Sequence, residues 1–134
     1  MKLRSGKALH YKKLPQILEN KIQNNLNIIE KILVDNKKAA SELLTIIGSA
    51  YNTSSRFDIS NKVSEIFHDN DQKTITSKYA LSAASGTLLM LIAGDNAFYD
   101  EHEDILPLEY QDLIKEKILD SSITLIGDTE GVNS

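Results

Sequence analysis

Residues 80–93 read ALSAASGTLLMLIA, a stretch that contains neither a charged residue nor a proline. A helix that is apolar on all sides is usually buried on most of them, and the small residues at 83–86 allow neighbouring helices to approach closely. We therefore predict the central helix of the fold at about 73–93, with Gly94 as the residue that ends it. The apolar run falls short of the ~20 residues that cross a bilayer, so no membrane span is expected.

Three helices are predicted before this segment, because apolar side chains recur there at spacings of three and four residues. Their expected bounds are about 15–35, 36–51 and 58–68. Pro15 suits the first turn of a helix, where its missing N–H costs nothing. Asp35 or Asn36 is expected to cap the second helix and Asp58 the third, because short polar side chains accept hydrogen bonds from free backbone N–H groups.

After the central helix, a fifth helix is predicted to begin at Pro107. Regular structure is expected to end at Gly127, which leaves 128–134 as a polar tail, and 122–126 is also compatible with a short strand. The predicted fold is therefore all-α: a single domain of 134 residues in which about five helices pack around the central one.

The absence of cysteine excludes a disulfide framework, a thiolate zinc site and a cysteine nucleophile. The first 13 residues, MKLRSGKALHYKK, have no apolar core of the length that a secretory signal requires. We therefore expect an intracellular protein, cytoplasmic or, in a eukaryotic or viral setting, nuclear.

Charge divides the chain into three blocks. Residues 1–13 carry five basic residues and no acid, 14–93 are balanced, and 94–134 carry eleven acids against Lys115 and Lys117. A basic arm, a neutral body and an acidic C-terminal third are typical of a chain that meets its partners through its ends.

The densest acidic segment, 95–104, is the first candidate site. Aromatic residues among charged ones are common at protein-binding hot spots, although the same aromatics could instead fix the loop to the body. The candidate protein-binding residues are Phe98, Tyr99, Asp100, Glu101, Glu103 and Asp104. The segment lacks the EF-hand ligand pattern, so no metal is expected.

No catalytic or cofactor motif is found either. Ser85-Gly86 lacks the G-x-S-x-G frame of a nucleophile elbow, and no strand is predicted before it. We therefore expect a protein without a cofactor that is not an enzyme.

The basic arm is the second candidate site. Its candidate nucleic-acid-binding residues are Lys2, Arg4, Lys7, Lys12 and Lys13. These cations could neutralise phosphates, but a pI near 5.3 is unlike that of a dedicated nucleic-acid-binding domain. Residues 1–12 have few apolar side chains, so the sequence alone predicts a flexible arm.

The hypothesis that the sequence favours is a helical protein-interaction domain. Its acidic C-terminal third would bind a partner with a basic surface, as a small regulator or inhibitor does. Two alternatives stay open: a nucleic-acid-associated regulator that uses the basic arm, and a self-assembling structural protein in which basic and acidic ends of different copies pair into a homo-oligomer.

Overall fold

The computed structural model describes residues 13–50, 55–68, 72–94, 101–102, 104–105 and 107–133. This part of the chain forms five helices and no strand, which confirms the all-α prediction. The helices are α2 (Gln16–Ile32), α3 (Lys37–Gly48), α4 (Arg56–Ile66), α5 (Gln72–Ala93) and α7 (Pro107–Asn133).

Several predicted helix ends are confirmed by their local geometry. Asn36 caps α3, because its side-chain oxygen accepts a hydrogen bond from the backbone N–H of Ala39 at 3.2 Å. Gly94 ends α5 with a φ of 72°, a left-handed conformation that costs glycine little. Pro15 immediately precedes α2, and its carbonyl accepts the N–H of Glu19 at 2.9 Å.

Two predicted boundaries are wrong. Helix α4 begins at Arg56, so Asp58 lies in its first turn and not at its cap, where its charge still interacts favourably with the helix dipole. Helix α7 continues through Gly127 to Asn133, so neither a helix end at Gly127 nor a strand at 122–126 is present. Glycine costs only about 1 kcal/mol inside a helix, which does not stop one already held by packing.

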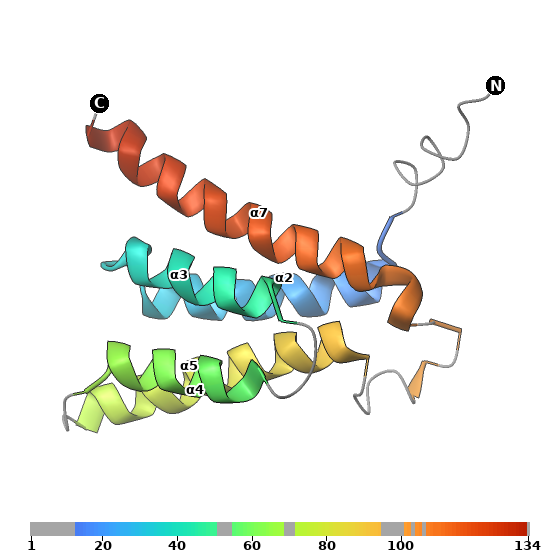
Figure 1. Ribbon diagram of the computed structural model, residues 1–134, viewed down its shortest axis with the longest axis horizontal. Helices are drawn as coiled ribbons and strands as arrows, with labels where there is room; N and C mark the ends of the chain where they lie inside the picture. Colours follow the sequence, from blue (N-terminus) through green and yellow to red (C-terminus); the bar gives the residue numbers. More distant parts are fainter. Residues whose placement is uncertain are drawn as a thin grey trace.

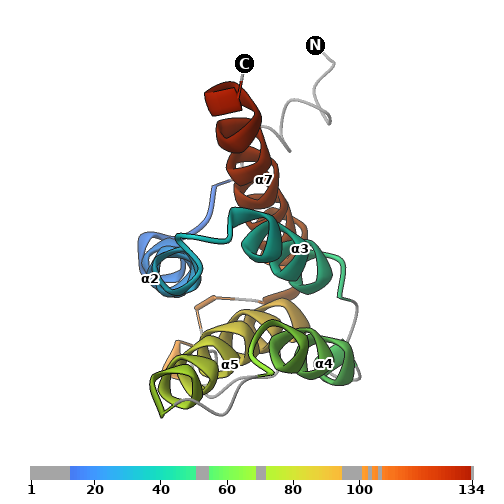
Figure 2. The same ribbon diagram turned by 90° about the vertical axis from the view of Figure 1, so that its left-hand side faces the viewer.

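The helices lie in layers (Figures 1 and 2). Helices α4 and α5 form one outer layer, α2 and α3 lie in the middle, and α7 lies across the opposite side. Helix α5 contacts each of the other four helices, as expected of the central helix, although α3 does so too. Its core residues Leu81, Leu88 and Leu89 have no exposed surface.

Helix α5 is nevertheless buried on one side and not on most sides. Tyr79 is 72% exposed, and Ser82 and Ala83 also face solvent. By length and composition alone, the stretch Ile75–Ala93 could cross a membrane, although the sequence predicted no membrane span. In the structure, 39% of this stretch is buried. A core helix passes the same test, because small uncharged residues such as Ala83 raise its apolar content without needing burial.

Helices α3 and α7 make the most extensive contact in the fold, around the buried hydroxyl groups of Ser41 and Ser122. The Ser41 hydroxyl donates to the carbonyl of Ser122 at 3.0 Å, and the Ser122 hydroxyl donates to the carbonyl of Ser41 at 2.8 Å. The Thr45 hydroxyl lies 2.7 Å from the Ser122 hydroxyl. These reciprocal bonds fix the register of the two helices, because a shift along α7 would leave buried polar groups unpaired.

An ion-pair cluster joins α3 to α4. Lys62 Nζ lies 2.6 Å from Glu42 Oε1 and 3.0 Å from Glu65 Oε1. The hydrogen bond from Lys62 lowers the pKa of Glu42, and the bonds to Glu42 and Glu65 raise the pKa of Lys62. The pair therefore stabilises the fold above the unfolded pKa of the carboxyl, and that stability is lost as pH falls through the lowered folded value. On the alkaline side it is lost as pH rises through the raised pKa of Lys62.

We expect Glu42→Gln to destabilise the fold at neutral pH by less than about 1 kcal/mol, because the Glu42 side chain is 45% exposed and water screens the pair. This loss of stability should shrink towards zero as the pH falls and Glu42 becomes protonated in the parent protein. Urea unfolding at about pH 7 and about pH 3 measures both values. Glu65→Gln is the matched control, with a smaller effect because the Glu65 side chain is 70% exposed. An equal loss for Glu42→Gln at both pH values would contradict the assignment.

Candidate functional site

Four exposed acids form a line along α7, and we call them the acidic ridge. They are Glu109, Asp112, Glu116 and Asp120. Their spacings of three, four and four residues place them on one face of the helix. The opposite face carries the buried Ile114, Ile118 and Ser122 that hold α7 on the bundle, so packing directs the acids to solvent.

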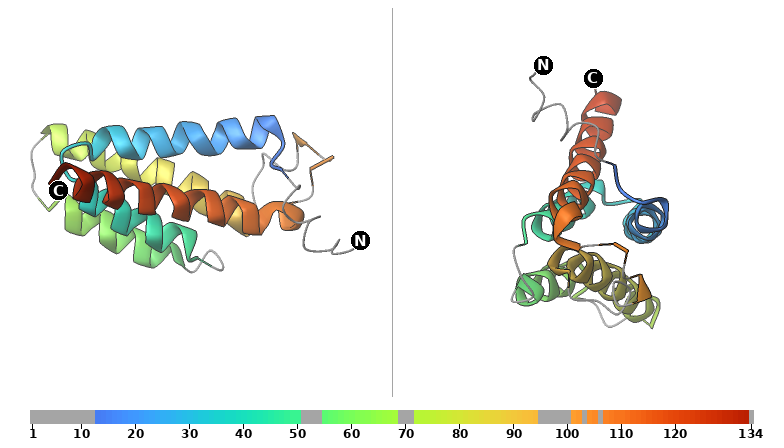
Figure 3. Two further views of the ribbon diagram at one scale, coloured as in Figure 1. Left: turned by 90° about the horizontal axis from the view of Figure 1, so that it is seen from above. Right: turned by 90° about the vertical axis from the view of Figure 1, so that its right-hand side faces the viewer.

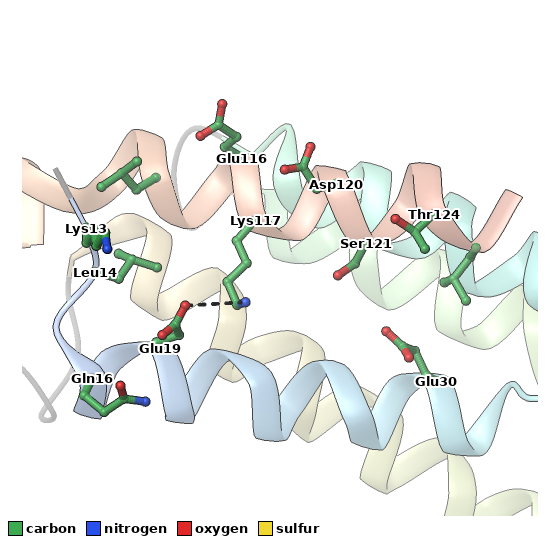
Figure 4. Close-up of a pocket in the computed structure, with 12 residues that line it drawn as sticks. Lys13, Leu14, Gln16, Glu19, Glu30, Glu116, Lys117, Asp120, Ser121 and Thr124 are labelled. Atoms are coloured by element: carbon green, nitrogen blue, oxygen red, sulfur yellow. Dashed lines mark ion pairs between the residues drawn. The ribbon is translucent and has the colours of Figure 1, made fainter. Parts of the chain in front are cut away.

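One flank of the ridge borders a groove between α2 and α7, with a volume of about 790 Å³ (Figure 4). We call it the α2–α7 groove. It is lined by Lys13, Leu14, Gln16, Glu19, Glu30, Leu113, Glu116, Lys117, Asp120, Ser121, Thr124 and Leu125. Four acids against two lysines give it a formal charge of −2.

The two walls of the groove are weakly joined. Lys117 Nζ and Glu19 Oε2 are 4.0 Å apart, at the end of the groove near Lys13 (Figure 4). Both side chains are partly exposed, and such a pair contributes at most about 1 kcal/mol. Helix α7 packs mainly on α3 and only slightly on α2, as the end-on views show (Figures 2 and 3). The groove therefore stays open along most of its length.

A second groove, of about 480 Å³, runs along the other flank of the ridge, between α3 and α7. Glu116 and Asp120 border both grooves, whereas Asp112 lines only the second one. Ile123, which is 69% exposed, lies in the second groove as well. This division makes Asp112 a natural control for charge changes aimed at the α2–α7 groove.

The predicted protein-binding residues are only partly described. Phe98, Tyr99, Asp100 and Glu103 lie outside the described residues. Glu101 and Asp104 are exposed, but neither lines the α2–α7 groove.

Of the predicted basic-arm residues, Lys2, Arg4, Lys7 and Lys12 lie outside the described residues. Lys13 is exposed and lines the acidic α2–α7 groove.

The acidic ridge was missed by sequence analysis, although its signal was visible. The acids at 109, 112, 116 and 120 recur with the same helical period as the apolar residues, but a net charge does not show that they share one face of the helix. The volume of the groove had no such signal, because it depends on how far α7 diverges from α2.

Other candidates for chemistry stay isolated in the described part of the chain. Ser85 is fully buried, and its hydroxyl has no hydrogen-bond partner there. No group of three histidine, aspartate or glutamate side chains comes together as a metal site among the residues that could be searched.

No family model matches the sequence, and no curated protein and no solved structure is significantly similar to it. The groove itself therefore carries the functional evidence. Its lining combines four carboxylates with the apolar side chains of Leu14, Leu113 and the largely buried Leu125, a combination that complements a cationic segment with apolar side chains of its own.

Proposed function

We propose that this protein is a non-catalytic binding domain that takes up a basic segment of a partner protein in the α2–α7 groove. In this role it would act as a small regulator or inhibitor. The observation that carries the proposal is the groove itself, whose lining combines four carboxylates, two lysines and three leucines and has a formal charge of −2.

The charges and the apolar residues would act at different stages of binding. Exposed carboxylates attract a basic partner over a distance and raise its association rate, whereas lysines in their place would repel the cations of the bound partner. Leu113 and Leu125 would then hold apolar side chains of the partner, which slows dissociation. These two residues are twelve positions apart on one helix, a length of about 18 Å. That length fits about three turns of a helix or five to six extended residues.

Affinity capture from the native host tests the proposal, with nuclease present so that bridging nucleic acid is removed. We expect a nuclease-resistant partner that the parent protein retains and the double variant Glu30→Lys/Asp120→Lys loses. The control Asp112→Lys reverses one carboxylate of the acidic ridge that lines only the second groove, so this variant should retain the partner. Capture that is equal for the groove variant and the parent would contradict the proposal. Capture that nuclease abolishes would favour the nucleic-acid alternative.

The acidic segment before α7 can be separated from the groove with the same partner. Reversing Asp100, Glu101, Glu103 and Asp104 to lysine should slow association at low salt without unfolding the domain, because these charges act on encounter. If the groove is the binding site, dissociation should stay unchanged in this variant and accelerate in Leu113→Ala. Stopped-flow mixing measures both rates. Faster dissociation of the segment variant would place the binding site there instead.

A further inference from the structure

The chain carries a basic segment of its own next to the groove, and we infer that residues 1–12 occupy the α2–α7 groove and compete with the partner. This inference rests on the proposed function, because it concerns the regulation of the same site. The occupant is the arm of the same chain, and the arm of a second copy is the alternative that the test must separate.

The place where the described chain begins supports this occupant. Lys13 and Leu14 both line the groove, at the end where α2 and α7 begin (Figure 4). Residues 1–12 are therefore tethered to the rim of the groove. A short tether gives an effective concentration of about 1 mM, so even a weak intrinsic affinity is sufficient for high occupancy.

Charge complementarity supports it as well. Residues 1–12 carry Lys2, Arg4, Lys7 and Lys12 and no acid, whereas the groove has a formal charge of −2. The side chains of Glu30 and Asp120 lie farther along the groove from Lys13 (Figure 4), where cations of the arm could reach them.

The length and composition of the arm also fit. Twelve extended residues reach at most about 40 Å, more than twice the 18 Å or so between Leu113 and Leu125. The arm can therefore turn back at Lys13 and run the length of the groove. Leu3, Leu9 and Tyr11 supply apolar side chains for the groove residues. From the sequence alone the arm is expected to be flexible, because no surface for these side chains is visible there.

Amide hydrogen exchange of residues 2–10 in the full-length protein, free of nucleic acid, tests the inference. An effective concentration of about 1 mM and a dissociation constant near 0.1 mM give about tenfold protection over the unbound arm. We expect this protection in the parent and in Asp112→Lys, and its loss in Glu30→Lys/Asp120→Lys. It should also fall with added salt. Equal exchange in the parent and in the groove variant would overturn the inference.

A second variant tests the inference even if Glu30→Lys/Asp120→Lys does not fold. Changing Lys2, Arg4, Lys7 and Lys12 to serine in the full chain alters only the arm, and it should abolish the protection while circular dichroism stays unchanged. Protection that persists in this variant counts against the inference. Protection that rises with protein concentration would show that the arm of a second copy is the occupant, which also overturns it.

The exchange experiment needs no partner, so its failure is distinct from a failure of the proposed function. If a partner is captured, the arm variant should bind it about tenfold more tightly than the parent, because no competing occupant must leave first. Unchanged affinity would overturn the competition while leaving partner binding in place. Arm protection without any captured partner would support occupancy of the groove by the arm and count against the proposed function.

Discussion

Leu89→Asp should unfold the domain. Leu89 lies in the C-terminal half of α5, has no exposed surface and belongs to the apolar core of the bundle. Burying an unpaired charge and removing a packed side chain together cost several kcal/mol, a large part of the stability of a domain of this size. Circular dichroism should show loss of most helical signal at 25 °C or a greatly lowered melting temperature.

Ala83→Asp is the matched control on the same helix. Ala83 faces solvent, so the same carboxylate stays hydrated there and should cost no more than about 1 kcal/mol, mainly through the lower helix propensity of aspartate. If Leu89→Asp and Ala83→Asp have the same melting temperature, burial of α5 is not what stabilises the fold. A Leu89→Asp variant that melts like the parent protein would contradict the central position of this helix.

Gly48→Val should destabilise the fold by about 1–3 kcal/mol through overpacking. A Cβ at position 48 would lie 2.7 Å from both Cγ and Cδ2 of Leu119, so α7 or its side chain must move. Adding Leu119→Ala should recover part of the loss, with a coupling of about 0.5–3 kcal/mol in a double-mutant cycle. Urea unfolding of the two single variants and the double variant measures it, and additive effects would contradict the contact.

Gly86→Ala provides the opposite case. Its added Cβ would meet no atom within 4 Å, and Gly86 lies inside a helix. Alanine should therefore stabilise the protein by about 0.5–1 kcal/mol, because it loses less backbone entropy on folding. The contrast between the two positions tests whether α7 approaches α3 as closely as the structure shows.

The helices could be predicted because their apolar residues follow a helical period that ends at recognisable residues. Asn36 and Gly94 have local chemistry that determines a boundary whatever packs around them. The end of α7 could not be predicted this way. Gly127 resembles a terminator, but the helix through it is already held by buried residues such as Ser122, whose partners are on α3.

For the candidate site, only the negative charge could be predicted from the sequence. An excess of acids after residue 94 indicated a surface for a basic partner, and the acidic ridge lies in that region. The α2 wall of the groove could not be foreseen, because Glu19 and Glu30 belong to the charge-balanced body of the sequence. Their approach to α7 is a result of how α7 packs on α3, which depends on contacts such as that between Gly48 and Leu119.

The pairing of α3 with α7 also has a consequence for synthesis on the ribosome. Ser41 and its partner Ser122 are separated by 81 residues. At 5–20 residues per second, the ribosome takes roughly 4–16 s to add that much chain. During this interval the face of α3 that α7 will cover has no partner, so the nascent helices expose apolar surface until the last helix emerges. We expect cotranslational chaperones to bind this protein mainly in that interval.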